Sequence, residues 1–363
     1  MIHKILSVFK NQQLQTDHQI NRQIVKMLYP FHFLFILLCS PKFSLTSKYI
    51  RPNERKRIFI SFLSVCFVII VTIYFMYFKG DNEAYINLHG NDVIIQVIVF
   101  SVNVFYCIGI VMIFVTNTIH RQNNVSLIVM IQRLVESIVV KKSVSSLTVW
   151  NWIIAIIVVS VNFFIFTAYF IVIKYELSSL PMLIRNYLYT TFDINFAYAI
   201  FIITLLTKLV NGWSNMIIKL SQGPELGGLC SNLSKTYQNI LETYKLYENM
   251  FQGLQLTVFN NPVIDLSATL WITKDIILVI CHSIQCEKFY IAVEEAKMVC
   301  IQLTKNKNCP NDQTRLYKEV LRTSRNFNKI SAYGLVYVDV KLPISVIGLL
   351  TGYIVVLLQL NLL

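Results

Sequence analysis

The chain has 363 residues, of which 55% are hydrophobic and only 14% are charged. A soluble protein of this size is nearer roughly 45–50% apolar and 25% charged, so the composition excludes an ordinary soluble domain and predicts a membrane protein. The formal net charge is +13, and the basic residues lie between the apolar segments. This placement indicates a role in orienting the chain in the membrane and in contact with anionic lipids, rather than nucleic-acid binding.

Seven apolar segments predict an all-α polytopic membrane protein, because a transmembrane helix needs about 20 mostly apolar residues. Before them, residues 27–39 form a shorter apolar run that contains Pro30, and we expect this run to lie at the inner membrane interface. The alternative is that it spans the membrane, in which case the orientation derived below does not hold. The sequence Asn-Asn-Pro at 260–262 separates the fifth and sixth segments as a turn. The predicted spans are residues 58–78, 93–119, 149–173, 187–210, 244–259, 263–281 and 342–360.

The distribution of lysine and arginine predicts the orientation of these spans. The segments expected in the cytoplasm (1–57, 120–147, 212–242 and 285–341) carry 26 Lys and Arg residues, and the segments expected outside carry three. Basic residues concentrate on the cytoplasmic side of a membrane protein. The N-terminus is therefore expected in the cytoplasm and the C-terminus outside, opposite to a G-protein-coupled receptor.

Apolar residues recur at helical spacing in the cytoplasmic segments, which predicts helices that extend below the membrane. One stripe includes Tyr237, Tyr244 and Tyr247, and another includes Leu316 and Val320. Residues 287–305 are also expected to be helical. We expect these extensions to pack together.

The sequence lacks the motifs of common enzymes and metal sites. It has no phosphate loop, no Gly-rich dinucleotide fingerprint, no HExxH and no G-x-S-x-G. Cys281, Cys286, Cys300 and Cys309 do not have the paired spacing of a zinc site. We therefore expect no enzymatic activity, no catalytic residue, no cofactor and no metal.

The C-terminal 30 residues contain a recognisable pattern. Residues 331–339 (SAYGLVYVD) lead into the last span, which ends with Tyr353, five apolar residues, Gln359 and Leu360. This resembles the insect gustatory receptor family, whose signature is TYhhhhhQF, where h is apolar. Gly352 stands in place of the signature Thr and Leu360 in place of Phe, which leaves the subfamily open. Ile354 follows Tyr353 where the sugar-responsive branch tends to carry Glu, which favours the bitter or a divergent branch.

The resemblance implies a ligand-gated, non-selective cation channel in the plasma membrane of chemosensory neurons, opened by a small organic tastant. It implies a homotetramer, or a heteromer with other gustatory receptor subunits, embedded in membrane lipids and binding no nucleic acid. The expected organisation is a cytoplasmic N-terminal segment with an interfacial helix at 1–57 and six spans that form a ligand-binding bundle at 58–284. A cytoplasmic loop with an anchor-domain helix follows at 285–340, and the pore-lining helix at 341–363.

The last span has the features of a pore helix. Gly348 and Gly352 are spaced G-x-x-x-G, which permits close approach of backbones. Val356 and Leu360 share one helix face, and a ring of such residues can close a pore by dewetting. Gln359 is costly in lipid and is expected to face the pore or a neighbouring subunit, although its place near the helix end also permits contact with interfacial water. The expected pore and gate residues are Gly352, Tyr353, Val356, Gln359 and Leu360.

In the family the ligand lies among the outer halves of the spans, where this chain has aromatic and polar residues suited to a small organic molecule. Asp193 is the most informative, since an intramembrane carboxylate indicates function by default; alternatively it is solvated or paired with Arg185. Lys274 and Asp275 point in different directions from adjacent positions, so each is expected to find its own partner in a structural network. The expected ligand-binding residues are Phe166, Tyr169, Tyr189, Asp193, Gln255, Asp265 and Trp271.

Two other functions stay open at this point. A metabotropic seven-span chemoreceptor would have the opposite charge bias. A membrane transporter would be expected to carry paired broken helices at the bilayer midplane, which the sequence does not show.

Overall fold

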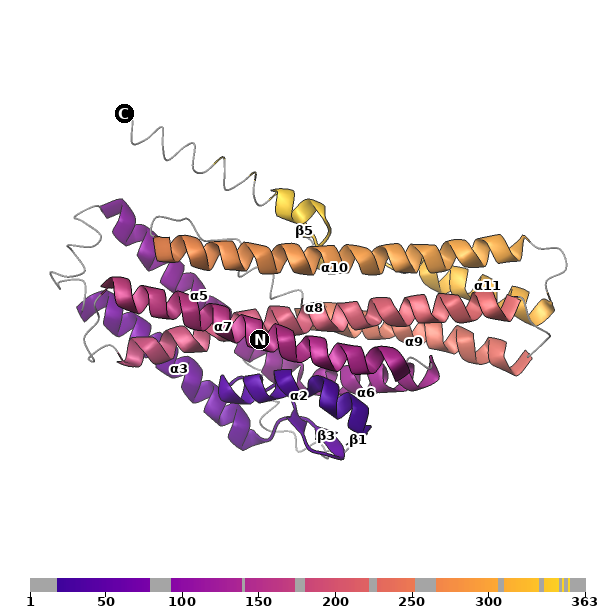
Figure 1. Cartoon of the computed structure of the whole chain (residues 1–363), viewed down its shortest axis with the longest axis horizontal. Coiled ribbons are helices and arrows are strands. Elements are labelled where there is room, and N and C mark those ends of the chain that lie inside the picture. Colours follow the sequence, from indigo (N-terminus) through magenta and orange to yellow (C-terminus); the bar gives the residue numbers. More distant parts are fainter. Residues whose placement is uncertain are drawn as a thin grey trace.

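The structure is a computed structural model that describes residues 18–78, 93–138, 141–173, 180–221, 227–251, 266–305, 310–332 and 336–345, together with Gly348 and Gly352. Long helices dominate it (Figure 1). In chain order the helices are α2 (Arg22–Leu37), α3 (Arg55–Phe78), α5 (Val93–Ile119), α6 (Arg121–Ser137), α7 (Lys141–Ile173), α8 (Leu180–Ser221), α9 (Gly227–Phe251), α10 (Leu266–Thr304) and α11 (Asn311–Ser324).

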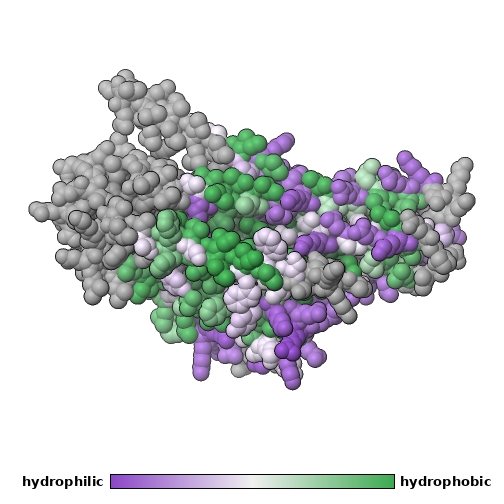
Figure 2. All heavy atoms as spheres, viewed as in Figure 1, coloured by the Kyte–Doolittle hydropathy of each residue, from purple (hydrophilic) through white to green (hydrophobic). Residues whose placement is uncertain are grey.

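The described helices confirm an all-α polytopic membrane protein. Four of them, α3, α7, α8 and α10, are long and apolar enough to cross a membrane. The pair α5 and α6 adds a fifth candidate if it counts as one span, and it is bent by 68°. Figure 2 shows green, hydrophobic side chains over the middle of the molecule and purple, hydrophilic ones towards the right end and the lower edge.

The apolar faces of the outer helices match a lipid environment. On α7, Phe163 and Phe164 are 70% and 68% exposed. On α3, Phe59 and Ile70 are also exposed. In a soluble protein so large an exposed apolar surface would be unfavourable, whereas lipid covers it at no cost.

Helices α8 and α10 form the centre of the bundle and lie side by side along most of their length (Figure 1). Almost every residue of α8 from Leu188 to Phe201 is buried, because α3, α7, α9 and α10 all pack against this helix. Helix α8 therefore presents its polar residues to neighbouring helices rather than to lipid.

The N-terminal part of the chain packs onto the side of this bundle. Helix α2 is capped by Asn21, whose side chain accepts a hydrogen bond from the backbone of Gln23. Its apolar face, with Met27, Phe31 and Phe35 fully buried, packs on α7 and α8. Below it lies a small antiparallel sheet in the order β1-β3-β2, formed by His18–Gln19, Tyr49–Arg51 and Ser44–Leu45, with His18 and Leu45 both paired to Ile50.

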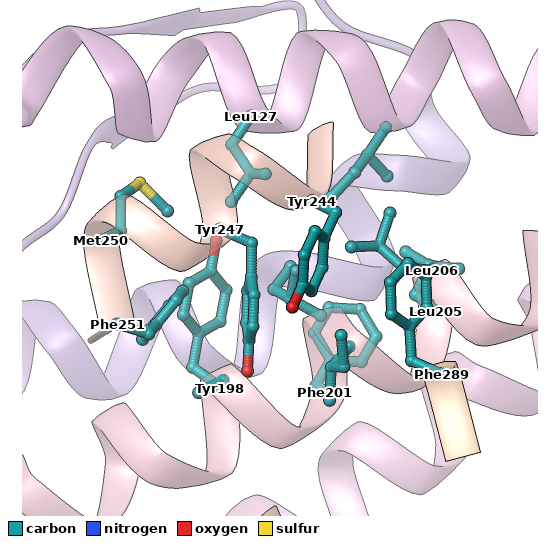
Figure 3. Close-up of a cluster of buried hydrophobic side chains, with 14 of the residues drawn as sticks. Leu127, Tyr198, Phe201, Leu205, Leu206, Tyr244, Tyr247, Met250, Phe251 and Phe289 are labelled. Carbon is teal, nitrogen blue, oxygen red and sulfur yellow. The ribbon is translucent and has the colours of Figure 1, made fainter. Parts of the chain in front are cut away.

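Towards the right end of the long axis in Figure 1, α9, α11 and the second half of α10 lie around the end of α8, and α6 packs mainly on α9. An aromatic cluster joins α9 and α10 (Figure 3). The rings of Tyr244 and Phe289 stack with their centroids 4.8 Å apart, and the ring centroids of Tyr247 and Phe251 are also 4.8 Å apart. The buried Trp213 of α8 donates from its indole Nε1 to the carbonyl of Leu233, 2.8 Å away. The helical extensions expected from the sequence therefore do pack together.

Several boundaries differ from the predictions. Helix α10 continues unbroken to Thr304, whereas the sequence predicted a span ending at 281 and a separate helix from 287. Helix α9 begins at Gly227 and runs through the predicted start of the fifth span at Tyr244, and the rest of that span, 252–259, lies outside the described residues. Helix α6 was not predicted. Residues 341–345, Gly348 and Gly352 are helical, and the rest of the predicted span 342–360 is outside the described part of the chain.

Candidate functional site in the membrane bundle

A buried polar network connects four helices within the membrane-spanning bundle. Asn162 of α7, Asp193 of α8, Lys274 of α10 and Tyr106 of α5 belong to it, with Asp275 beside Lys274. A charged side chain inside a bilayer is costly unless it is paired, so these contacts offset the cost of placing the charges there.

Lys274 and Asp193 form the centre of the network. The ammonium Nζ lies 2.7 Å from Asp193 Oδ2, and the side chains of Lys274 and Asp193 are only 10% and 2% exposed. Asn162 donates from Nδ2 to the same carboxylate oxygen at 2.6 Å and accepts from Lys274 Nζ through Oδ1 at 3.3 Å. Both atoms of the Asn162 amide are thereby used, and the three residues fix the relative positions of α7, α8 and α10.

Asp275 forms the second half of the network. Its Oδ2 accepts a hydrogen bond from the Tyr106 hydroxyl at 3.0 Å, and its Oδ1 lies 3.5 Å from Lys274 Nζ. One ammonium thus stands between two carboxylates, so the network carries an excess of negative charge when all three groups are ionised. Such an arrangement favours ligands that bring positive charge or hydrogen-bond donors.

Aromatic rings cover the Asp275 side of the network. Tyr106 stacks on Tyr189 of α8 with ring centroids 4.6 Å apart, and Phe192 meets Tyr106 edge-on at 5.6 Å. The guanidinium of Arg185 lies 5.5 Å from the centre of the Tyr189 ring, and the Tyr189 hydroxyl is 3.5 Å from that of Thr72 on α3. Aromatic walls with a few polar groups are the usual lining of sites for small organic molecules.

The structure brings together two of the residues predicted for the ligand site, Tyr189 and Asp193. Asp193 is 1% exposed and pairs with Lys274, so the alternatives of a solvated carboxylate and of a pair with Arg185 are both wrong. Arg185 instead donates to the side chain of Asn186 and covers Tyr189. Lys274 and Asp275 do have different partners, as expected, and the long lysine side chain also reaches its neighbour.

The other predicted site residues are described less fully or not at all. Phe166 and Tyr169 lie on α7 and Trp271 on α10, but the positions of their side chains are outside the described part. Gln255 and Asp265 fall in a segment that is not described. Of the expected pore residues, Gly352 is helical and exposed, whereas Tyr353, Val356, Gln359 and Leu360 lie outside the described residues.

Neither Tyr106 nor Asn162 was among the site residues predicted from the sequence. Tyr106 is one of 19 tyrosines, and only its position opposite Asp275 distinguishes it. Asn162 did carry a weak signal, because it is a polar residue within an otherwise apolar run and occupies the same helix face as Ala155 and Val158, which are also buried.

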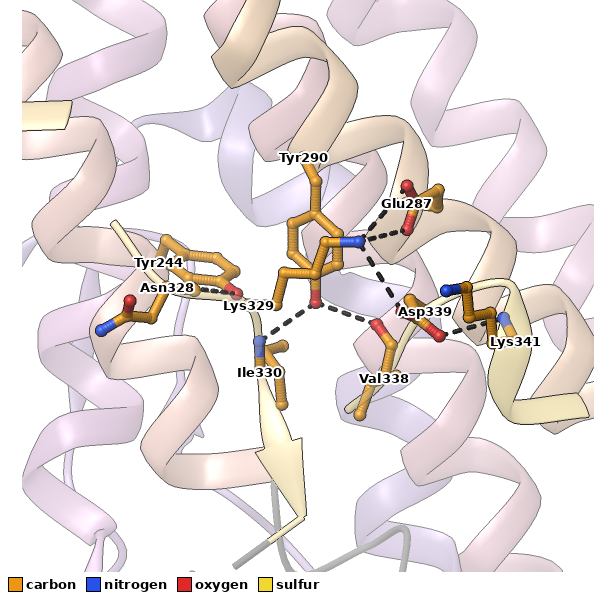
Figure 4. A network of polar contacts seen from close by, with 9 residues as sticks. All are labelled: Tyr244, Glu287, Tyr290, Asn328, Lys329, Ile330, Val338, Asp339 and Lys341. Carbon is orange, nitrogen blue, oxygen red and sulfur yellow. Dashed lines mark hydrogen bonds and ion pairs between the residues drawn. The ribbon is translucent and has the colours of Figure 1, made fainter. Parts of the chain in front are cut away.

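A second network, outside the ligand-site candidates, holds the segment that precedes the last helix (Figure 4). The Tyr290 hydroxyl of α10 accepts from the backbone N–H of Ile330 at 3.2 Å and donates to the carbonyl of Val338 at 3.0 Å. Lys329 is ion-paired with Glu287 at 3.2 Å and lies 3.7 Å from Asp339. The short strands β4 (Ser331–Ala332) and β5 (Val336–Tyr337) lie between these contacts. These contacts therefore attach the segment before Lys341 to α10.

Comparisons with known proteins agree with this architecture. No protein-family model matches the chain, and no curated protein matches it. Among solved structures, the chain is similar to the insect olfactory receptor OR5 from Machilis hrabei in complex with eugenol, with a TM-score of 0.56 and 10% sequence identity. The likeness covers 99% of both chains. The chain therefore shares the fold of this olfactory receptor over nearly its whole length.

Proposed function

We propose that the chain is a subunit of a ligand-gated cation channel that serves as a chemoreceptor. The observation that carries this proposal is the full-length likeness to a receptor whose structure holds a small organic molecule, eugenol. The buried network of Asp193, Lys274 and Asp275 supports it, because a bundle kept together only for stability gains little from charges in its interior.

In this proposal the ligand binds between α5, α7, α8 and α10, against the aromatic rings of Tyr106 and Tyr189. A donor group of the ligand competes with Lys274 for the carboxylates of Asp193 and Asp275. Binding changes the packing of α10, and the contacts of Tyr290 and Lys329 carry that change to the last helix. Four copies of that helix line the pore, with Gln359 facing water.

The finer assignment is a gustatory receptor of the bitter or a divergent branch, which acts in the plasma membrane of chemosensory neurons. Its support is the C-terminal pattern around Tyr353 and Gln359 and the presence of Ile354. Assembly as a homotetramer or as a heteromer with related subunits is part of the same assignment. An excess of basic residues in the segments assigned to the cytoplasm supports the orientation with the C-terminus outside.

The test is to express the chain alone in cultured cells and to record whole-cell current while plant alkaloids and sugars are applied, with G-protein signalling blocked. We expect a current that persists under the block. A current that disappears would support the metabotropic alternative, and transport without channel current would support a transporter.

Replacement of Gln359 tests the pore. Gln359→Glu adds charge to the proposed pore lining, so the permeability ratio of Ca²⁺ to Na⁺ should rise. Gln302→Glu, at an exposed position near the end of α10, is the matched control and should leave the ratio unchanged. Equal ratios in Gln359→Glu and the unmodified channel would remove Gln359 from the pore.

A further inference from the structure

Lys42, in the loop between α2 and β2, is a buried cation that lies apart from the polar network of the membrane bundle. The residue is only 4% exposed. Among the described residues no carboxylate forms an ion pair with it. Burial lowers the pKa of its amine to about 7, because a desolvated ammonium is costly. The groups around Lys42 therefore decide how well the charged form is held.

Three aromatic rings from three helices surround this ammonium group. Its Nζ lies 5.4 Å from the ring centre of Phe35 on α2, 5.7 Å from that of Tyr198 on α8 and 5.2 Å from that of Phe251 on α9. All three rings are almost completely buried. A cation within about 6 Å of a ring centre is attracted to the face of the ring, and the attraction is strongest where water is excluded.

The rings form the walls of a cage, and a side-chain amide closes it. The planes of Phe35 and Tyr198 meet at 84° with their centroids 5.6 Å apart. Tyr198 and Phe251 lie beside each other in the aromatic cluster of Figure 3, with centroids 5.9 Å apart. Asn117 of α5 accepts a hydrogen bond from Lys42 Nζ through its Oδ1 at 3.0 Å. Aromatic walls together with one hydrogen-bond acceptor suit the recognition of an ammonium group.

The backbone of the loop directs Lys42 into this cage. Cys39 follows the end of α2 with a φ of 54°, and the backbone N–H of Ser40 donates to the carbonyl of Phe35 at 2.9 Å. Asn117 donates through Nδ2 to the Ser40 hydroxyl at 3.3 Å, so the residue that binds the ammonium also binds the loop. The loop therefore turns back at the end of α2, and its lysine reaches α5, α8 and α9.

We propose that the cage is a binding site for a primary ammonium group, which the chain fills with its own Lys42. The site consists of Phe35, Asn117, Tyr198 and Phe251. Lys42 acts as a tethered ligand that fastens the loop after α2 to α5, α8 and α9. A fully methylated ammonium has no N–H for the Asn117 oxygen, so a primary ammonium is the class that uses every wall. The site lies apart from the proposed ligand-binding region and does not depend on channel activity.

The first experiment replaces the tethered ligand with a free one. Lys42→Ala, in the full chain purified in a neutral detergent, removes the atoms from Cγ to Nζ, which propylammonium matches. The Tm is measured with propylammonium or with 1-propanol, its uncharged counterpart. We expect propylammonium to raise the Tm of Lys42→Ala while 1-propanol does not, and the unmodified chain to respond to neither. An equal rise with 1-propanol would show that only volume is filled, and no rise with either would also overturn the site.

The second experiment keeps Lys42 and decides the matter even if Lys42→Ala does not fold. Acetylation of amines, followed by mass spectrometry, should modify Lys42 at least about tenfold more slowly than Lys48, an exposed lysine further along the same connection. Phe251→Leu keeps apolar bulk but removes one ring, so acetylation of Lys42 should accelerate by about tenfold, the scale of one desolvated cation–π contact. Phe289→Leu removes a buried ring that stacks on Tyr244 instead, and this matched control should leave the rate at Lys42 unchanged. Equal rates at Lys42 and Lys48 in the unmodified chain, or equal acceleration by both substitutions, would refute the assignment.

Discussion

The ion pair between Lys274 and Asp193 makes a quantitative prediction about the stability of the membrane bundle. Asp193→Asn removes one of the two carboxylates around the ammonium, and Lys274→Met removes the ammonium and leaves both carboxylates without it. The two substitutions therefore break the same contact with unequal consequences. Lys274→Met should be the more damaging, although methionine is the more apolar side chain.

The magnitudes follow from the distances. With an effective dielectric constant of about 20, the Lys274–Asp193 contact at 2.7 Å contributes about 6 kcal/mol of attraction, and the Lys274–Asp275 contact at 3.5 Å about 5 kcal/mol. Removal of one partner of a buried pair costs about 3–5 kcal/mol net of desolvation. Asp193→Asn should lower the free energy of unfolding by about 3 kcal/mol, because Asp275 still neutralises Lys274. Lys274→Met should lower it by about 5 kcal/mol.

The assay is reversible unfolding of the purified chain in mixed micelles, which gives the free energy of unfolding for each variant. The double variant Asp193→Asn/Lys274→Met should lose less free energy of unfolding than Lys274→Met alone. In the double variant Asp275 is the one of the three charges that remains, and Tyr106 still donates a hydrogen bond to it. Glu294→Gln, which breaks an exposed pair with Lys297 on the same helix, is the control and should cost less than about 1 kcal/mol. A loss below 1 kcal/mol for Lys274→Met, or a larger one for Asp193→Asn, would contradict the reasoning.

Two further predictions concern groups outside the polar network. Tyr290→Phe leaves two buried backbone groups unpaired, so hydrogen exchange of residues 328–340 should accelerate by tenfold or more on the basis of about 1–3 kcal/mol per group, whereas the exposed Tyr337→Phe should leave exchange unchanged. Burial lowers the pKa of Lys42 to about 7, while in the unfolded chain it is about 10.4. The unfolded state binds more protons between these values, so the free energy of unfolding should rise with pH by up to about 1.4 kcal/mol per unit. Lys42→Met should lose this slope in unfolding measurements from pH 7 to 10, and an unchanged slope would assign the dependence to other groups.

The apolar spans were the part of the fold most visible in the sequence. Helices α3, α5, α7 and α8 each coincide with an apolar run, since lipid selects for composition over the whole length of a helix. The continuity of α10 was not visible, because its sequence changes from apolar to charged near Glu287, where the helix leaves one environment for another without ending. Helix α6 was missed because it starts at Arg121 directly after α5, and His120 provides no side-chain cap to mark the start.

The candidate site was only partly predictable for a different reason. A charge within an apolar run identifies itself, so Asp193 and Lys274 could be found from the sequence. Their pairing could not, because 81 positions separate them and tertiary packing alone brings them together. Tyr106 gives no signal of its own, because it is one of 19 tyrosines.

The most direct test of the proposed channel is a map of the purified, full-length protein in lipid nanodiscs at a resolution that places side chains. The account predicts four copies around a central axis, with the helix that begins at Lys341 nearest that axis and Gln359 turned towards water. A single protomer with this last helix against lipid, or a chain end on the same side as the N-terminus, would contradict it.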